Sequence, residues 1–352
     1  MGQPGDTGAA NRGGNPRAVI FGCSGMAVTA EEKSFFAEAD PAGFILFERN
    51  CRDRPQIRGL VADLKESVGG VRAGVLIDQE GGRVQRLKPP RWRAAPPAAA
   101  FGALAKHDRE RAQEAARLNA RLIAAELRDL GITVNCAPVL DVPGPDGHEI
   151  IGDRAFGGDA GTVAALGLAA CEGFLTGGVL PVIKHVPGHG RATTDSHLEL
   201  PVVDAEARDL EATDLAPFRA LNHMPWAMTA HVVYEALDAE NPATTSAKVI
   251  QETIRGTIGF SGVLVSDDIG MKALRGPYDR RAAAALAAGC DLVLHGSGDR
   301  AEMEAVAEGT GPLTAEAAAR LDRGEAMRGE AAAWDADAGR ARLDEILSQG
   351  TA

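Results

Sequence analysis

The chain has 352 residues, of which 45% are hydrophobic, so it is long enough to bury a large core in one domain. Its formal net charge of -12 at pH 7 disfavours binding to nucleic acid or to an anionic membrane, because both depend on clustered Lys and Arg side chains. The five cysteines are widely spaced in apolar segments, which is typical of reduced core residues in a cytoplasmic protein.

The first segment, residues 1–17, is polar and glycine-rich and has no apolar stretch, so we expect a disordered leader and no secretory signal. No apolar run approaches the ~18 residues that a membrane-spanning helix needs. We therefore expect a cytoplasmic protein without a membrane anchor. Beyond the leader we expect one domain over residues 18–340, including terminal helices on its outer surface, and a tail at residues 341–352.

Short runs rich in Val, Ile and Leu alternate along the chain with longer alanine-rich stretches of helical character. This alternation predicts βαβ units around a parallel sheet. The expected strands are 18–25, 43–50, 73–82, 133–142, 179–188, 226–234, 262–271 and 291–298. Eight such strands predict a single (β/α)8 TIM-barrel domain. A doubly wound open sheet is the alternative, but the sequence has no glycine-rich dinucleotide motif and no P-loop, so no nucleotide cofactor is expected.

Polar side chains close five of these eight strands. They are Asp78, Asp141, Lys184 with His185, His231, and Asp267 with Asp268. The C-terminal ends of the strands meet at one face of a barrel, so these side chains are expected to share a pocket. A single one of them is explained as a cap of the following turn, whereas five together favour a functional site.

The segment KHVPGHGRATTDSH, residues 184–197, carries three of the eight histidines. It fits either a metal site or an acid/base site, since histidine serves in both. A metal is disfavoured, because the early strands end without a His-x-His pair and the intervening VPG prevents a helix that would align His185 with His189. Gly188 and Gly190 predict a mobile loop after the strand, with an ordered turn as the alternative.

A series of motifs runs through the chain in a fixed order: ILFERN, IDQEGGRVQRL, NCAPVLDV, IGDRAFG, KHVPGHG followed by DSHLELP, MTAHVVY, NPATTS and VSDDIGM. This series covers about residues 18 to 300 and resembles glycoside hydrolase family 3. Within that family it is similar to the single-domain β-N-acetylglucosaminidases of bacterial peptidoglycan recycling. The sequence departs from the family at Val186, where Phe is frequent, and at Ile269-Gly270, where Leu-Ser is common.

The resemblance implies a retaining hydrolysis in two displacement steps through a covalent glycosyl-enzyme. In VSDDIGM, Asp267 matches the family nucleophile, whereas Asp268 is explained equally well as a cap of the next turn. In DSH, His197 matches the acid/base and Asp195 its partner. Imidazole suits this chemistry because its pKa near 6.5 in model peptides lets it give and take a proton near neutral pH. His189 has no catalytic assignment and is expected to shape the loop.

The same resemblance implies the substrate contacts: Asp78, Arg86, Arg154, Lys184 and His185, with His231 and Met271 on the wall of the sugar site. The implied substrate is a carbohydrate, GlcNAc-1,6-anhydro-MurNAc with or without its peptide, from which a monomeric enzyme without metal or cofactor removes terminal β-GlcNAc. For Arg154, an ion pair with Asp153 or Asp159 is the purely structural alternative.

Three other activities fit the same scaffold. A β-N-acetylglucosaminide phosphorylase is one, because a neutral histidine would not repel an incoming phosphate. A family 3 β-glucosidase is the second. A catalytically silent sugar-binding protein is the third, although a binder would not need Asp267, Asp195 and His197 together.

Overall fold

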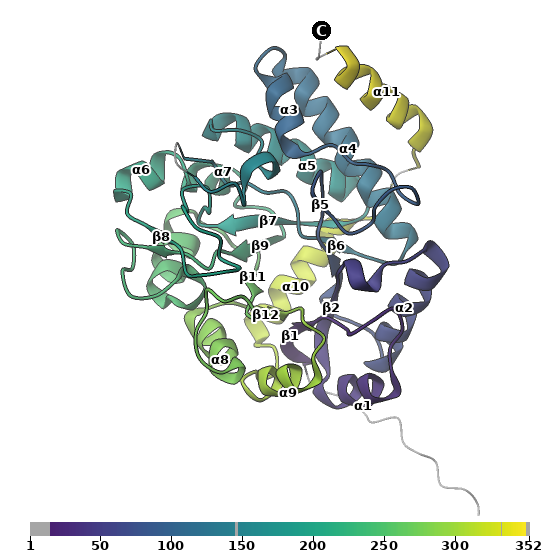
Figure 1. Cartoon of the computed structure of the whole chain (residues 1–352), viewed down its shortest axis with the longest axis vertical. Coiled ribbons are helices and arrows are strands. Elements are labelled where there is room, and N and C mark those ends of the chain that lie inside the picture. Colours follow the sequence, from purple (N-terminus) through teal and green to yellow (C-terminus); the bar gives the residue numbers. More distant parts are fainter. Residues whose placement is uncertain (1–14, 145–146, 332, 350–352) are drawn as a thin grey trace, which may run out of the picture.

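A computed structural model describes residues 15–144, 147–331 and 333–349 (Figure 1). Eight parallel strands form a closed barrel in the order β1-β12-β11-β9-β7-β6-β3-β2. They are β1 (Arg17–Phe21), β2 (Pro41–Leu46), β3 (Gly74–Ile77), β6 (Val134–Asn135), β7 (Leu180–Val186), β9 (Trp226–Thr229), β11 (Val263–Asp268) and β12 (Leu292–His295). Each expected strand overlaps one of them, so the (β/α)8 barrel is confirmed and the open sheet is excluded.

Helices surround the strands in Figure 1. They are α1 (Ala30–Ala39), α2 (Arg54–Ser67), α3 (Ala98–Ala105), α4 (Arg109–Asp129), α5 (Ala160–Thr176), α6 (Ala207–Ala212), α7 (Leu215–Ala220), α8 (Tyr278–Ala288), α9 (Arg300–Glu308), α10 (Ala315–Arg328) and α11 (Ala336–Gln349). Shorter turns are η1 (Glu48–Asn50), η2 (Gly152–Arg154) and η3 (Ala243–Thr245), and η4 (Val249–Thr257) is a π-helix. Two small sheets complete the described part, one of β4 (Gln79–Gly81) with β5 (Val84–Gln85) and one of β8 (Val202–Val203) with β10 (Val233–Tyr234).

Most barrel strands are shorter than the apolar runs that predicted them. The clearest case is the run 133–142, of which only Val134–Asn135 forms the strand β6. Pro138 in this run lacks the backbone N–H that a strand donates to its neighbour, so regular pairing stops before it. The rest of the run continues irregularly beside β7, where Leu140 N–H donates to the carbonyl oxygen of Lys184 at 2.7 Å, and it brings Asp141 into the site.

The apolar side chains form two layers. An inner cluster fills the barrel, and it includes Leu313, just before α10, and Ala317 and Leu321 on that helix. On α10, Gly324 lies against Trp226 at the first residue of β9, so this helix closes the N-terminal end of the barrel. The opposite, C-terminal end is left for the site, as in other barrels of this type.

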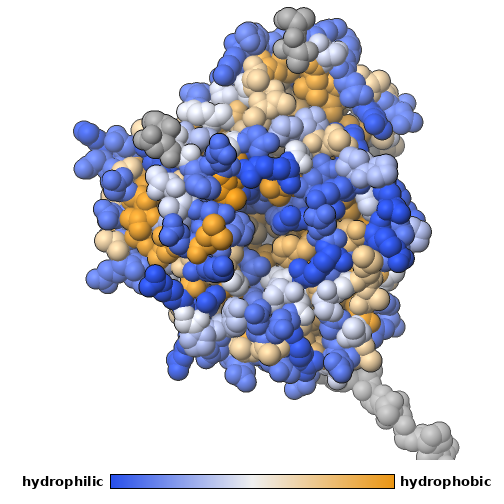
Figure 2. Space-filling view, viewed as in Figure 1, coloured by the Kyte–Doolittle hydropathy of each residue, from blue (hydrophilic) through white to orange (hydrophobic). Residues whose placement is uncertain are grey.

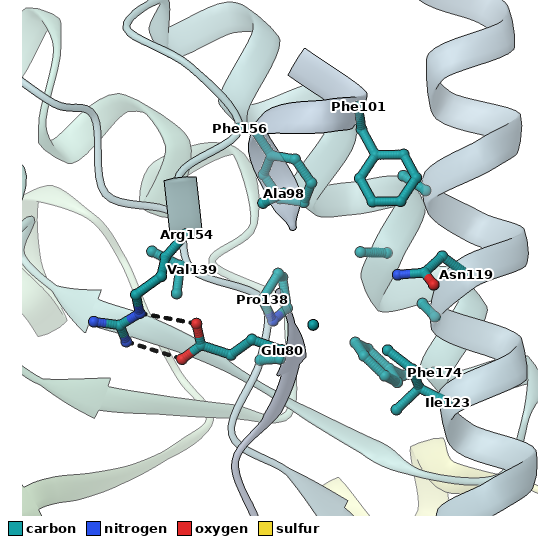
Figure 3. Close-up of a pocket in the computed structure, with 15 residues that line it drawn as sticks. Glu80, Ala98, Phe101, Asn119, Ile123, Pro138, Val139, Arg154, Phe156 and Phe174 are labelled. Carbon is teal, nitrogen blue, oxygen red and sulfur yellow. Dashed lines mark hydrogen bonds and ion pairs between the residues drawn. The ribbon is translucent and has the colours of Figure 1, made fainter. Parts of the chain in front are cut away.

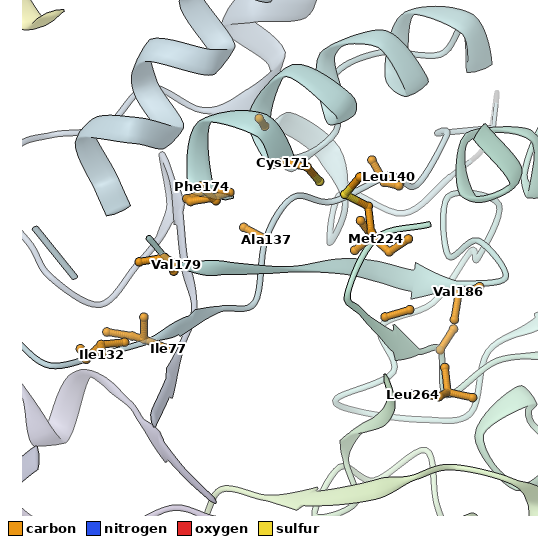
Figure 4. Packing of buried hydrophobic residues seen from close by; sticks show 14 of the residues in the cluster. Ile77, Ile132, Ala137, Leu140, Cys171, Phe174, Val179, Val186, Met224 and Leu264 are labelled. Carbon is orange, nitrogen blue, oxygen red and sulfur yellow. The ribbon is translucent and has the colours of Figure 1, made fainter. Parts of the chain in front are cut away.

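An outer cluster lies between the strands and the surrounding helices. Figure 4 shows part of it, where Cys171 and Phe174 of α5 meet Ala137 and Leu140 from the segment after β6. The five cysteines are free thiols and all but Cys51 are buried, which confirms the expected core placement.

The C-terminal helix α11 packs along α4 (Figure 1). Arg342 joins the two helices through a two-bond ion pair with Glu114, at 2.8 and 3.0 Å, and Ile346 is buried beside it. The helix crosses the start of the expected tail, residues 341–352, without a break. The expected leader, residues 1–17, lies almost entirely outside the described residues.

The face shown in Figure 2 is covered mainly by hydrophilic side chains, with hydrophobic ones in small groups between them. In the ranges that the structure describes, none of the helices is both long enough and apolar enough to pass through a lipid bilayer.

Two Gly→Ala substitutions test the packing of the outer helices. A Cβ at Gly102 on α3 would lie 1.5 Å from the carbonyl oxygen of Phe156, so Gly102→Ala forces α3 away from the barrel and should lower the free energy of unfolding by about 1–3 kcal/mol. At the exposed Gly59 on α2 the built Cβ meets no atom within 4 Å, so Gly59→Ala should raise it by about 0.5–1 kcal/mol through helix propensity. Urea unfolding followed by circular dichroism measures both, and stabilisation by Gly102→Ala would contradict the packing.

Candidate active site

A cleft opens at the C-terminal ends of the barrel strands and holds about 1000 Å³ of empty space, open solvent at its mouth included. Eight of the ten residues assigned from the sequence line it: Asp78, Arg86, Arg154, Lys184, His185, His197, Asp267 and Met271. The other two, Asp195 and His231, each bond to a residue of the lining. The barrel therefore brings together side chains from segments almost 200 residues apart.

Five charged side chains form a network on one side of the cleft. Lys184 Nζ lies 2.9 Å from Asp78 Oδ1 and 2.7 Å from Glu80 Oε1. Arg86 Nη2 lies 3.1 Å from Asp78 Oδ2, and Arg154 holds Glu80 through two bonds of 2.9 and 2.8 Å (Figure 3). Burial alone would raise the pKa of both carboxyls, but the attraction of the cations outweighs it and lowers them, to about 2 for Glu80. Both carboxylates are therefore ionised acceptors.

The partner of Arg154 corrects the structural alternative considered from the sequence. Arg154 pairs with Glu80, which is 74 positions away, and not with Asp153 or Asp159. Asp153 binds Arg83 instead, at 2.7 Å, and Asp159 accepts a backbone N–H at the start of α5.

Glu80 is a site residue that the sequence reasoning missed. It lies two residues after Asp78, and alternation along an extended chain places both on the same side, so the signal was present in IDQEGG. Its far side faces a second, mainly apolar cavity under α3, α4 and α5, with Phe101, Asn119 and Phe174 in its lining (Figure 3). The Glu80–Arg154 pair thus separates a polar cleft from apolar packing, where water screens it little.

Asp141 fixes two histidines at the floor of the cleft. Its Oδ2 lies 2.7 Å from His185 Nδ1, and its Oδ1 accepts the backbone N–H groups of His185 at 3.0 Å and His189 at 2.7 Å. Burial opposes ionisation of Asp141, but the attraction and hydrogen bond of His185 outweigh it and lower its pKa to about 2. Asp141 is therefore an anion that orients the ring of His185 and leaves Nε2 as the ring nitrogen for a ligand.

The two adjacent aspartates at the end of β11 have different surroundings. Asp267 Oδ1 accepts the N–H of Asp268 at 2.8 Å, and no other hydrogen bond to its carboxylate is found among the described residues. Asp268 is held by backbone donors on both oxygens, Gly270 N–H at 2.8 Å and Gly296 N–H at 3.2 Å. Asp268 therefore fixes the turn after the strand, while Asp267 keeps an oxygen for a ligand.

Electrostatics separates the same two carboxyls. Burial opposes ionisation of Asp267, but the attraction of His185 and His231 outweighs it and lowers its pKa. Burial raises the pKa of Asp268. His231 is itself buried behind the lining, where its Nδ1 lies 2.7 Å from Thr244 Oγ1 and its Nε2 lies 3.0 Å from the carbonyl oxygen of Asp268. The structure thus places His231 in support of the β11 turn and not on the surface of the cleft.

Asp195 and His197 lie on the loop that follows β7. His197 Nδ1 lies 2.8 Å from Asp195 Oδ1, and the same oxygen accepts the backbone N–H of His197 at 2.9 Å. These bonds outweigh partial burial and lower the pKa of Asp195. The His197 side chain is 59% exposed, and its Nε2 is the ring nitrogen left for a ligand. Between residues 15 and 349, apart from the undescribed positions, no group of three His, Cys, Asp or Glu side chains is placed to bind a metal ion.

Residues 16–323 match the family model of the glycosyl hydrolase family 3 N-terminal domain. The chain belongs to glycosyl hydrolase family 3. A β-hexosaminidase of Alkalilimnicola ehrlichii is 41% identical over 284 residues, which are 78% of this chain and 79% of that protein. The structure is similar to NagZ of Neisseria gonorrhoeae, with a TM-score of 0.84 and 32% identity over 95% of this chain and 98% of that one. It is also similar to a family 3 β-N-acetylglucosaminidase of a Paenibacillus strain, with a TM-score of 0.81 and 32% identity over 94% of this chain and 66% of that one.

Membership of this family confirms the resemblance that the sequence motifs indicated, and it makes the chain a glycoside hydrolase. The matched region runs from the start of β1 into α10, so the family domain contains all eight barrel strands and every residue assigned to the cleft.

Replacing Asp141 with Asn tests the electrostatics of the cleft floor. A pKa lowered from 3.8 to about 2 corresponds to about 2 kcal/mol of stability. Because the pKa is depressed in the folded state, this contribution is complete above about pH 4 and is lost as the pH falls toward 2. Asp141→Asn should therefore be destabilised most near pH 7, by a margin that shrinks below about pH 4.

Urea unfolding at pH 7 and pH 3 measures this margin. Asp204→Asn, at an exposed position, is the matched control and should change little at either pH. A deficit of Asp141→Asn that does not depend on pH would contradict the assignment of a buried anion.

Proposed function

We propose that this glycoside hydrolase is a retaining β-N-acetylglucosaminidase that removes terminal non-reducing β-GlcNAc from muropeptides such as GlcNAc-1,6-anhydro-MurNAc, with or without peptide, in peptidoglycan recycling. One observation carries the proposal: an ionised Asp267 and the Asp195–His197 pair border the same cleft. The names of the hexosaminidase and glucosaminidase relatives support the sugar, and the similarity of the motifs to recycling enzymes supports the muropeptide.

In the first step, an oxygen of Asp267 attacks the anomeric carbon of the bound sugar. The bond from that carbon to the leaving oxygen breaks, and the leaving oxygen takes a proton from Nε2 of His197. The products are a glycosyl ester on Asp267 and a free alcohol. Asp195 holds the ring by its other nitrogen and stabilises the imidazolium from which the proton comes, as the aspartate of a serine-protease triad does.

In the second step, water attacks the same carbon from the side that the leaving group vacated. It gives a proton to the now neutral His197, and Asp267 departs as a carboxylate. Two inversions retain the configuration of the sugar. A histidine takes the place of the carboxylic acid that most retaining glycosidases use.

The charged network is suited to hold sugar hydroxyls. Asp78 is ionised and borders the cleft, so it accepts hydrogen bonds and disfavours ligands that have no hydroxyl to donate. Arg86, Arg154 and Lys184 keep it ionised and line the same wall, and His185 lies beside them. Met271, also in the lining, offers an apolar contact to the sugar.

Turnover of aryl β-GlcNAc and aryl β-glucoside substrates tests the proposed function. The parent protein should hydrolyse the GlcNAc substrate much faster, and it should form no GlcNAc-1-phosphate when phosphate is added. Asp267→Ala should lower kcat by roughly 10³-fold or more, as expected when a covalent nucleophile is removed.

Each alternative gives a different result. Formation of GlcNAc-1-phosphate would establish a phosphorylase, and equal turnover of the two sugars would indicate a β-glucosidase. Hydrolysis at the background rate by the parent would leave a sugar-binding protein. Substantial residual turnover by Asp267→Ala would assign the nucleophile to Asp268 or to another carboxylate.

Removal of the His197 ring tests the acid/base assignment. His197→Ala should slow substrates with poor leaving groups far more than activated aryl substrates, because protonation matters less when the departing oxygen is already stable as an anion. The kcat/KM values of methyl β-GlcNAc and dinitrophenyl β-GlcNAc measure the difference. Leu198→Ala, at the exposed neighbouring residue, is the control, and equal losses on both substrates would remove His197 from the acid position.

A further inference from the structure

Ser196, the residue between the two members of the acid/base pair, is buried although its neighbours are not. Ser196 is 4% exposed, whereas the next residue but one, Leu198, is 66% exposed and Thr193 is also exposed. A short polar side chain in an exposed loop has no hydrophobic reason to be buried. Its burial therefore points to specific partners.

Ser196 has partners on both of its sides. Its Oγ lies 3.2 Å from Nε2 of His189, and its carbonyl oxygen accepts the N–H of Ala273 at 3.2 Å. Ala273 lies on the segment that follows the β11 aspartates. The loop is thus fastened at the one residue that lies between Asp195 and His197.

His189, in contrast, is held in position by contacts at the floor of the cleft. Its backbone N–H donates to Asp141 at 2.7 Å, and its ring packs on the ring of His185 with centroids 5.7 Å apart. Gly190, the next residue, packs closely against the backbone of the segment after β6, because a Cβ at Gly190 would lie 2.0 Å from the carbonyl oxygen of Val142. The contact from Ser196 to His189 therefore connects the loop to the floor of the cleft.

The near end of the loop is held independently. Arg191 binds the buried Asp214 through Nε at 2.7 Å and donates from Nη2 to Thr213 at 2.8 Å. The carbonyl oxygen of Ala192 also accepts the N–H of His148, at 2.8 Å, and beyond His197 the carbonyl oxygen of Pro201 accepts the N–H of Val233 at 3.0 Å. Between these attachments, the contacts of Ser196 are the ones nearest to Asp195 and His197 in the chain.

The chemistry of His189 fits a hydrogen-bond partner better than a proton donor. Burial holds the pKa of His189 down to about 4, so the ring is neutral near pH 7. A neutral imidazole has one donor and one acceptor, and a hydroxyl can serve either, so Nε2 and Oγ can bond in both tautomers.

We propose that His189 and Ser196 form a latch, defined as the Nε2–Oγ contact between them, which holds Asp195 and His197 over the cleft and makes His189 a positioning residue for the acid/base step. This inference rests on the proposed hydrolysis. It gives a function to the histidine of the KHVPGHG motif for which the sequence offered no chemistry.

Ser196→Ala removes the latch without changing either residue of the acid/base pair, Asp195 or His197. One hydrogen bond of this kind corresponds to about a 3- to 10-fold change, so kcat/KM for methyl β-GlcNAc should fall by that factor. The kcat/KM for dinitrophenyl β-GlcNAc should fall by less than about 2-fold, because its leaving group needs little protonation. Thr193→Ala, a hydroxyl deletion in the same loop, is the matched control and should leave both substrates unaffected. Equal losses on the two substrates with Ser196→Ala would overturn the proposal.

A double-variant cycle assigns the effect to the pair. If the latch is the only coupling between the two residues, combining Ser196→Ala with His189→Leu should lower kcat/KM for methyl β-GlcNAc no further than the more damaging of the two single substitutions does. Losses that multiply would overturn the latch. Should His189→Leu fail to fold, the comparison of Ser196→Ala with Thr193→Ala still decides.

Hydrogen exchange provides a readout that does not depend on activity. The amide of Ala273, which donates to the loop, should exchange faster in Ser196→Ala than in the parent and in Thr193→Ala. Unchanged exchange would overturn the latch. If the parent hydrolyses no β-GlcNAc, the proposed function fails, whereas the exchange result still reports on the loop.

Discussion

The buried ammonium group of Lys184 is the constraint around which the rest of the site is arranged. The residue is only 2% exposed, and a charge so buried is stable only when it is paired and hydrogen-bonded. Asp78 from the end of β3 and Glu80 from β4 supply the pairing, and Arg154 from η2 pairs with Glu80. Removing one member would leave an uncompensated buried charge, which typically costs about 3–5 kcal/mol. Three segments distant in sequence are therefore held at one end of the barrel.

The same network also contributes to the electrostatics around Asp267. Two carboxylates face three cations in it, so an excess of positive charge remains beside the end of β11. Lys184 is among the groups that lower the pKa of Asp267. His185 and His231 contribute more to this lowering, so the network adds to the ionisation of the proposed nucleophile and does not by itself cause it.

Barrel strands and a connecting loop contribute different parts of the site. Asp267, Asp78 and Lys184 lie at the ends of barrel strands, whereas Asp195 and His197 lie on the loop that follows β7. The latch between His189 and Ser196 is one hydrogen bond at this boundary. A contact of that strength can hold a loop in place and still release it, which suits the proposed action of His197 on both a leaving group and an incoming water.

The sequence by itself determined the eight strands, their polar ends and the identity of the family, because periodicity and motif spacing can be read along the chain without any knowledge of tertiary contacts. It did not determine where strands stop, as Pro138 shows. It did not identify Glu80 as the partner of Arg154, or Ser196 as the partner of His189. Those choices depend on which groups are desolvated together, and only the closed barrel decides which polar atoms lose water and must find one another.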